Sequence, residues 1–289
     1  MRNLLILGIV VSVMLIACAP TAEKIDGVYS SKVGQFEVFM LVEAERDGNT
    51  AILVDADEAI LEKYIPEDGF KHTANAFLIK ANGQNIMIDT GTGAGGILVE
   101  KIKKIGVEPE DINAVFITHL HGDHFGGLQR DGEAVYPNAT IYLSERELQH
   151  FTVTNPNPAA VAALAPYDSQ IETFEPAALN AEEKPALLPG IIPIAAFGHT
   201  PGHTLFQIEN GNDKLLIIAD LLHVALVQFA VPEISATFDI DPVTAAVVRR
   251  EVLSYAAENK IPLGGMHIVY PGIGTVETDE TGFKFTPAK

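Results

Sequence analysis

The sequence predicts an α/β fold in which helices cover two packed β-sheets, a sandwich of four layers. Apolar segments of strand length recur along the chain, and in both halves a pair of them is followed by a segment with helical periodicity. Sheets and helices must each bury an apolar face, and helices packed on the outer faces of two sheets satisfy this requirement. With 289 residues, 47% of them hydrophobic, the chain can bury a sizeable core, and we expect one large domain over residues 27–289.

The expected elements follow from apolar periodicity and from capping residues. The expected strands are 36–42, 51–54, 76–80, 85–89, 114–118, 140–143, 192–197, 204–209, 215–219 and 263–266. The expected helices are 56–64, 97–105, 144–151 and 242–259. Asp241 can cap the last helix, with Pro242 at its first position, and Asn82-Gly83 marks a hairpin turn. The Pro-rich stretch 155–193 is interpreted as an insertion within the domain.

The first residues have the pattern of an export signal. Arg2 precedes an apolar run over residues 4–16, which is too short to span a bilayer comfortably. Residues 15–18, Leu-Ile-Ala-Cys, resemble the lipobox of bacterial lipoproteins, in which the cysteine becomes the lipidated first residue. We therefore expect a signal peptide over 1–17, a lipid on Cys18 and a tether over 18–26. The alternative is an ordinary signal peptide with an incidental cysteine, and both interpretations imply export.

These features predict a protein of the cell envelope, held by its lipid in the periplasm or at the outer membrane. Ala19 stands where retained inner-membrane lipoproteins often carry aspartate, which favours the outer membrane. Cys18 is the only cysteine, so a disulfide within the chain is excluded. A formal charge of -19 repels polyanions, so we expect a small-molecule substrate and no nucleic acid. The sequence leaves a homodimer open.

The strongest chemical signal is the segment 118–124, Thr-His-Leu-His-Gly-Asp-His, directly after an apolar strand. Side chains two residues apart in extended backbone point the same way, so His119 and His121 converge. A turn at Gly122 lets Asp123 and His124 face a second point nearby. A hydrogen-bonded core histidine explains a lone His, but it does not explain three with an aspartate, because buried unpaired polar groups are costly. Imidazole and carboxylate together suit zinc.

Residues 119–128 resemble the signature of the metallo-β-lactamase superfamily, His-x-His-x-Asp-His followed by Phe-Gly-Gly-Leu. Further motifs of that family follow the family order. Asp89-Thr90-Gly91 resembles its early aspartate turn, and residues 198–203, Gly-His-Thr-Pro-Gly-His, resemble its third metal motif. Asp220 resembles the bridging carboxylate, and His267 the last ligand. The resemblance runs from about residue 36 to the C-terminus and implies the four-layer αββα sandwich.

The resemblance implies two divalent metal ions, of which zinc is expected. One ion would be held by His119, His121 and His199, the other by Asp123, His124 and His267, with Asp220 bridging them. It implies supporting roles for Asp89 and His203, which we leave outside the ligand set. Two ions roughly 3.5 to 4 Å apart would share a water, lower its pKa towards about 7 and supply hydroxide as the nucleophile. Asp123 would orient that nucleophile or move its proton.

A second glycine-rich pattern competes with this interpretation. Gly91, Gly93 and Gly96 fit the dinucleotide-binding motif and lie between an expected strand and helix. In that motif the following strand ends in an acidic residue, whereas here it ends in Thr118 and continues into His119. We therefore interpret the glycines as shaping the turn after Asp89.

The carboxylate at position 220 narrows the expected reaction, because true metallo-β-lactamases usually lack it. Glyoxalase-type thioesterases and the lactonase and organophosphate-hydrolase group retain it. The remaining pattern looks most like the quorum-quenching lactonase and methyl-parathion-hydrolase group: Asp220-x-x-His223, Phe238-Asp239-x-Asp241, Arg249-Arg250 and His267-x-x-x-Pro271-Gly272-x-Gly274. We expect opening of a lactone or related ester, as in acyl-homoserine lactonases, with activity towards phosphotriesters as well.

Alternatives remain at this point. Cleavage of β-lactams or of glyoxalase-type thioesters would use the same ligands. An iron-dependent oxidoreductase of the same fold is a different class, although flavodiiron enzymes usually carry Glu where His121 stands. A non-catalytic surface lipoprotein is a third class, against which the intact ligand set counts. His223 could line the pocket or pack in the core, and Phe229, within the apolar run 224–231, could form a substrate wall or core.

Overall fold

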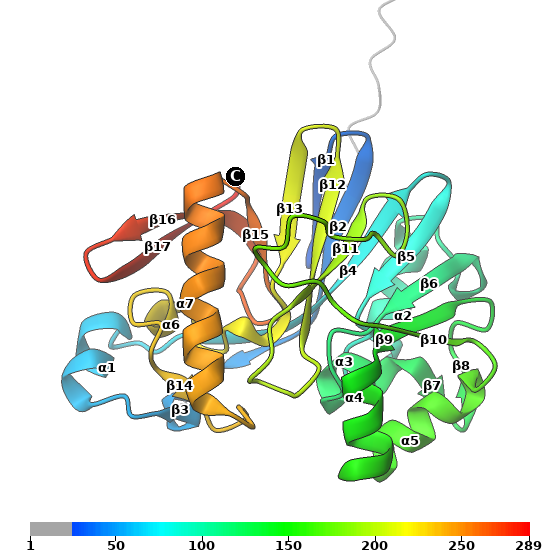
Figure 1. Cartoon of the computed structure of the whole chain (residues 1–289), viewed down its shortest axis with the longest axis horizontal. Coiled ribbons are helices and arrows are strands. Elements are labelled where there is room, and N and C mark those ends of the chain that lie inside the picture. Colours follow the sequence, from blue (N-terminus) through cyan, green and yellow to red (C-terminus); the bar gives the residue numbers. More distant parts are fainter. Residues whose placement is uncertain (1–24) are drawn as a thin grey trace, which may run out of the picture.

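Two principal β-sheets organise residues 25–289, the part of the chain that the computed structural model describes (Figure 1). The first sheet has seven strands in the order β1-β2-β4-β5-β6-β9-β10, and the second has six in the order β11-β12-β13-β15-β16-β17. The expected signal peptide, Cys18 and most of the tether lie outside the described residues. Within residues 25–289 no helix combines the length and the apolar character needed to cross a membrane.

The strands of both sheets are bounded as follows. The first sheet comprises β1 (Val28–Val33), β2 (Phe36–Asp47), β4 (Lys71–Ala81), β5 (Gln84–Ile88), β6 (Ile112–Phe116), β9 (Thr140–Ser144) and β10 (Ile171–Phe174). The second comprises β11 (Ile191–Ala195), β12 (Thr204–Asn210), β13 (Asp213–Ile217), β15 (Leu263–Gly264), β16 (Ile273–Asp279) and β17 (Gly282–Pro287). Short pairs are formed by β3 (Leu53–Val54) with β14 (Ser235–Ala236), and by β7 (Gln129–Arg130) with β8 (Glu133–Ala134).

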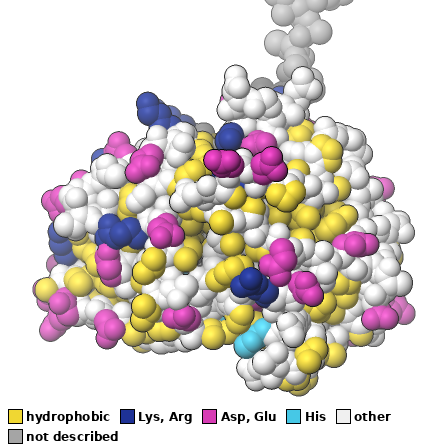
Figure 2. Space-filling model, in the orientation of Figure 1, with side chains coloured by type: hydrophobic (Ala, Val, Ile, Leu, Met, Phe, Trp, Pro, Cys, Tyr) yellow, Lys and Arg dark blue, Asp and Glu magenta, His cyan; other side chains and the backbone are white. Residues whose placement is uncertain are grey.

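Helices cover the outer faces of the sheets (Figure 1). Those on or beside the first sheet are α2 (Ile97–Lys104), α3 (Gly122–Phe125), α4 (Glu145–Gln149) and α5 (Pro158–Leu164). The second sheet is covered by α7 (Pro242–Asn259), with α1 (Glu58–Tyr64) and α6 (Ala225–Gln228) at its end. Figure 2 shows acidic side chains scattered among apolar ones on the face towards the viewer, in keeping with the net charge of -19.

Strand alternation divides the interior into three apolar layers. Leu41 and Leu78 face α2 and α5, whereas their neighbours Met40 and Phe77 lie between the two sheets. On the far side of the second sheet, residues such as Leu216 pack against α7. Successive side chains of a strand point to opposite faces, so each central strand serves two layers. The predicted four-layer αββα sandwich is confirmed.

Several element predictions need correction. Residues 50–52 form a 3₁₀ turn capped by the Asn49 side chain, so the strand expected at 51–54 is reduced to β3. The helix expected at 144–151 ends at Gln149 as an α-helix and continues as a π-helical turn over His150–Thr154. The stretch 155–193 is more than an insertion, because β10 pairs in parallel with β9 and extends the first sheet. The bounds predicted for α7 are correct.

The parallel strand pairs place chemistry-bearing segments at one edge of the sandwich. Strands β5, β6 and β9 run parallel in the first sheet, and β13 and β15 run parallel in the second. The carboxyl ends of parallel strands meet at the same edge, which is where open α/β sheets bind ligands. Asp89 follows β5, the segment 119–124 follows β6, Asp220 follows β13 and His267 follows β15. The Thr204 amide donates to the Thr118 carbonyl at 3.0 Å and joins the sheets there.

Candidate metal centre

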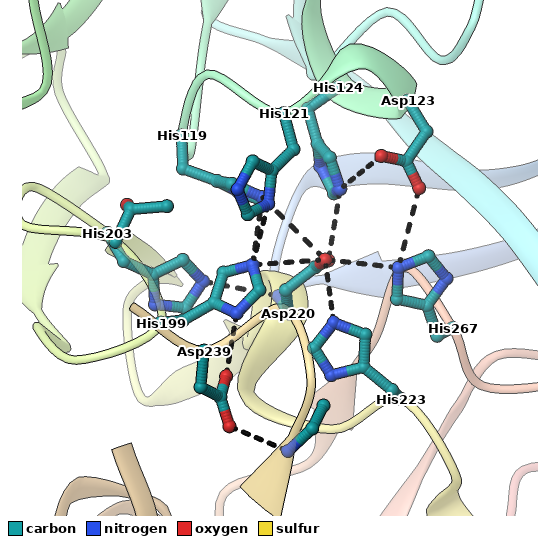
Figure 3. Close-up of polar contacts among 12 residues, drawn as sticks. His119, His121, Asp123, His124, His199, His203, Asp220, His223, Asp239 and His267 are labelled. Atoms are coloured by element: carbon teal, nitrogen blue, oxygen red, sulfur yellow. Dashed lines mark hydrogen bonds and ion pairs between the residues drawn. The ribbon is translucent and has the colours of Figure 1, made fainter. Parts of the chain in front are cut away.

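Three imidazoles and one carboxylate converge on a common point at this edge (Figure 3). The three facing nitrogens are His119 Nε2, His121 Nδ1 and His199 Nε2, and they lie 3.0 to 3.2 Å from one another. Asp220 Oδ2 lies 3.6 Å from the His119 nitrogen and 3.5 Å from the His199 nitrogen. The segments that supply them come from both sheets, and the structure brings these four predicted residues together.

A second group lies beside the first and includes the other three predicted residues. The ring nitrogens His124 Nε2 and His267 Nε2 each lie 3.1 Å from an oxygen of Asp220. Asp123, in the first turn of α3, places its carboxylate oxygens 3.6 Å from His124 Nε2 and 3.7 Å from His267 Nε2. Asp220 is therefore shared by the two groups (Figure 3).

The backbone at the strand end directs Asp220 into this position. Strand β13 ends at Ile217, and Ala219 adopts a positive φ of 46° before Asp220. Left-handed backbone costs a residue with a side chain about 1 kcal/mol or more, and such strain persists only where surrounding contacts hold it. One such contact is the Asp220 amide, which donates to His203 Nε2 at 3.2 Å, while His203 Nδ1 donates to the Ala196 carbonyl. His203 thus supports the carboxylate from behind, in line with the supporting role expected for it.

The polar groups behind the imidazoles determine which nitrogen faces the site. His199 Nδ1 lies 2.8 Å from Asp239 Oδ1, His124 Nδ1 lies 2.7 Å from Asp89 Oδ2, and His267 Nδ1 lies 2.7 Å from the Thr73 carbonyl oxygen. These oxygens are acceptors, so each Nδ1 must carry the hydrogen. A neutral imidazole then has its lone pair on Nε2, the nitrogen that faces the site.

The donor set fits divalent metal ions. A tetrahedral zinc ion with bonds of about 2.0 to 2.1 Å places neighbouring ligand atoms about 3.3 to 3.4 Å apart, close to the separations in both groups. Two buried atoms of the site, His124 Nε2 and Asp220 Oδ1, lie 3.1 Å from each other and form no hydrogen bond with any other group. Buried polar atoms are nearly always satisfied, and a divalent cation bound by these atoms would satisfy them. The cluster can therefore hold divalent metal.

Burial keeps the first group neutral. Removal from water lowers the pKa of His121 and of His199 to about 4, and it lowers the pKa of His119 well below its usual range. Imidazole binds metal only when neutral, so no proton needs to leave these side chains near pH 7.

The second group has the opposite balance. Burial by itself would lower the pKa of His124, but the Asp220 and Asp89 carboxylates raise it well above its usual range. The same balance, dominated by Asp220, raises the pKa of His267. Without metal, protons offset the negative charge here, and a divalent cation would replace them.

The family model of the metallo-beta-lactamase superfamily matches residues 70–260, which include the 119–124 segment, His199 and Asp220. The chain belongs to the metallo-beta-lactamase superfamily. A probable metallo-hydrolase of Methanocaldococcus jannaschii is 28% identical over 158 residues, 54% of this chain and 70% of that protein. Another curated relative is matched over only 24% of its own length.

Solved structures of the superfamily resemble almost the whole chain. The hydrolase AbOPH is 26% identical with a TM-score of 0.81, and the alignment covers 92% of this chain and 99% of that one. The dizinc quorum-quenching lactonase AidC, solved in complex with a product, is 27% identical with a TM-score of 0.78, covering 91% of this chain and 98% of that one. Together these relatives identify the protein as a metal-dependent hydrolase.

In this member of the superfamily, the two groups of candidate metal ligands, called the metal groups below, open into a cavity of about 630 Å³. His121, Asp123, Asp220 and His267 line it together with residues that sequence reasoning missed. The most notable is His72, near the start of β4, whose ring stacks on that of His267 with centroids 4.6 Å apart. A lone histidine in a long strand carries no signal of this kind, because only the packing of β4 beside the 267 loop brings the rings together.

His223 and Phe229, which the sequence left open, both line cavities. His223 is buried, its Nε2 lies 3.3 Å from Asp220 Oδ2, and it lines the cavity of the metal groups. Phe229 stacks on Phe285 and lines a neighbouring cavity, so it belongs to a wall as well as to the core.

Glu147 is a second residue that sequence reasoning missed. It is fully buried, and its carboxylate accepts hydrogen bonds from the Leu120 amide, the Gly202 amide and the Thr200 hydroxyl. It thus joins the 119–124 segment to the 198–203 segment. A Cβ at Gly202 would collide with the backbone of Glu147, which explains why glycine stands there. No sequence motif marks this glutamate, since its partners are backbone groups of distant loops.

The glycine-rich turn at 91–96 offers its amides to the protein itself. The Glu43 carboxylate accepts from the Thr92 amide at 2.7 Å and from the Gly93 amide at 3.0 Å. A dinucleotide phosphate would need those same donors. The interpretation that these glycines shape the turn after Asp89 agrees with this arrangement.

Proposed function

We propose that the protein is a dinuclear metal hydrolase that opens lactones or related esters. One ion is held by His119, His121 and His199, the other by Asp123, His124 and His267, and Asp220 bridges them. Zinc suits this set of imidazoles and carboxylates. The observation that supports the proposal most strongly is the position of Asp220, within 3.1 to 3.6 Å of ring nitrogens from both groups.

Bound divalent ions would supply Lewis acidity and a reactive water at neutral pH. The chain itself must position the substrate and move the proton. Asp123 is suited to the second task, because its carboxylate remains 32% exposed and lines the cavity, whereas Asp220 is buried. An oxygen of Asp123 can accept a proton from the attacking water and return it to the leaving alkoxide. His223 and His72 line the same cavity and can hydrogen bond to the substrate.

The choice of substrate rests on three supports. The carboxylate at position 220 is retained by the lactonase and organophosphate-hydrolase group and by glyoxalase-type thioesterases, whereas true metallo-β-lactamases usually lack it, so it counts against β-lactams. The similar solved structures include the lactonase AidC and the hydrolase AbOPH, each over about nine-tenths of this chain. The cavity volume of about 630 Å³ lies within the range of small-molecule sites, about 300 to 1,000 Å³. We therefore place lactone opening ahead of cleavage of phosphotriesters, β-lactams and thioesters.

The test uses protein that lacks residues 1–18, loaded with zinc and checked by elemental analysis. We expect metal-dependent turnover of an acyl-homoserine lactone that exceeds the rate on a β-lactam and on a glutathione thioester. Activity confined to β-lactams or thioesters would reject the lactonase assignment, and an iron-dependent redox activity would reject hydrolysis.

Asp123 has a matched control for its proposed role. Asp123→Asn should lower the rate of lactone turnover although the protein keeps part of its metal. Asp131→Asn, at an exposed turn, should leave that rate unchanged. Equal rates for the two variants would remove Asp123 from the reaction.

We also propose that the protein is exported and anchored in the cell envelope by a lipid on Cys18, as the first residues predict. Full-length protein should fractionate with membranes and incorporate labelled fatty acid, whereas Cys18→Ser should do neither. Label retained by the serine variant would rule out this anchor. The size of the soluble domain in solution decides whether it forms a homodimer.

A further inference from the structure

A second cavity of about 570 Å³ adjoins the metal groups. Its walls come from the loop after α1, from α6, from the 267–270 segment and from the C-terminal hairpin β16–β17. They are largely apolar and include Phe70, Leu226, Phe229, Ile268, Phe283 and Phe285. The apolar share of this lining is larger than that of the first cavity, where most of the lining residues are polar or charged.

The two cavities share a wall. His223 and His267 line both of them, so one molecule can contact the metal groups and still extend into the second cavity. Residues at the paired ends of β2 and β4 contribute to both cavities. Arg46, Asp47 and His72 line the first cavity, and Glu45 and Lys71 line the second.

The apolar wall of the second cavity is open to water at its rim. Leu226 on α6 is 47% exposed and Val269 is 42% exposed, although both are large and apolar. Contiguous apolar surface at a concave site marks a place where a ligand binds. The first cavity, with Ile52 and Phe238 as its large apolar lining residues, offers an aliphatic chain less apolar surface than the second.

We propose that the second cavity binds the aliphatic chain of the substrate, so that the preferred substrates are lactones or esters with a medium or long acyl chain. This inference rests on the proposed function for the identity of the reacting group. The ester group lies at the metal groups, and the chain passes His223 and His267 into the second cavity. Each methylene that it buries strengthens binding by a factor of about two to four.

The kinetic test compares N-butanoyl- with N-decanoyl-homoserine lactone. We expect kcat/KM to be at least about tenfold higher for the longer chain. Leu226→Glu places a charge in the wall and should lower this ratio about tenfold or more. Val161→Glu is the matched control, because Val161 is 43% exposed on α5 and lines neither cavity, and its ratio should not change. Leu226→Gln and Val161→Gln repeat the comparison without a new charge.

A binding test separates the inference from the proposed function. Decan-1-ol should raise the Tm of the metal-free protein more than butan-1-ol does, and Leu226→Gln should reduce that difference while Val161→Gln retains it. If these shifts occur but no lactone is hydrolysed, the proposed function fails and the chain-binding cavity stands. If lactones are hydrolysed with no chain-length preference and the Tm shifts do not differ, the inference is overturned and the proposed function stands.

Discussion

Asp239 accepts a hydrogen bond from Nδ1 of His199 at 2.8 Å, and this contact sets the ring nitrogen that His199 presents to the site. Asp239 is itself held by the Ala236 amide and by Arg249, whose guanidinium lies 3.4 Å from Oδ2. Arg249 is buried and also donates to the carbonyls of Leu221, Pro232 and Ile234. Helix α7 therefore supports His199 through a chain of charged hydrogen bonds.

Replacing Asp239 by Asn should weaken metal binding at the His119, His121 and His199 group. The Asn amide would hold the His199 imidazole less strongly than the Asp239 carboxylate does. Loss of such an outer partner typically lowers metal affinity 10- to 100-fold, and we expect a decrease of about that size. Competition with a chromophoric chelator measures the affinity. Asp241→Asn is the control, because Asp241 caps α7 and asparagine caps equally well. Equal affinities in the two variants would contradict a role for Asp239 in positioning His199.

Replacing Asp220 by Asn should disturb both metal groups at once. We expect metal content to fall from about two ions per chain and the rate to fall by about 100-fold or more, since the loss exceeds that of an outer partner. Asp213 lies at the exposed start of β13, the strand that Asp220 follows, so Asp213→Asn serves as the control. Elemental analysis that finds full occupancy in the Asp220 variant would remove this carboxylate from the bridge.

Zinc binding near pH 7 should release protons. The pKa of His124 lies well above its usual range and that of His267 is also raised, both held up chiefly by Asp220 against burial, so the protonated forms are favoured without metal. Metal competes with these protons, and we expect proton release on binding and an affinity that falls as the pH falls. Calorimetry in buffers of different ionisation enthalpy measures the release. Binding without proton release would contradict this prediction.

Glu147 should make the free energy of unfolding depend on pH between about pH 4.5 and 8. Burial raises the pKa of its carboxyl to about 7 from 4.5, against the lowering by the Leu120, Thr200 and Gly202 donors. Because the folded-state pKa is raised, the contribution is fully present below about pH 4.5 and is lost as the pH rises through about 7.

The measurement compares wild type with Glu147→Gln by chemical denaturation from pH 4.5 to 8, with chelator present throughout. As the pH rises, the free energy of unfolding of wild type should fall relative to the variant by about 3 kcal/mol. A constant difference between the two proteins would show that Glu147 remains ionised in the fold.

The ligand-rich segments could be predicted because their geometry is local. His119 and His121 are two residues apart in extended backbone after a buried strand, so their side chains point the same way. Asp123 and His124 follow in the next turn, so these neighbours in sequence are also neighbours in space. Helix α7 was predicted with its correct bounds for the same reason, since the Asp241 cap and Pro242 act on adjacent backbone groups. The strand expected at 51–54 was too long, because the Asn49 cap favoured a 3₁₀ turn over residues 50–52 and left only β3 as strand.

By itself, then, the sequence determined the sandwich, its apolar layers and the residues suited to bind metal, because periodicity and local motifs encode them. The position of Asp220 between the two histidine groups was implied by the family resemblance, and the packing of β13 against the neighbouring strands places it there. Only the tertiary structure decided that His72 stacks on His267 and that Glu147 and Arg249 support the site. It alone revealed the apolar second cavity, whose walls come from Phe70, α6 and β16–β17. These contacts join segments far apart in the chain, and no local pattern specifies a distance between segments that only packing brings together.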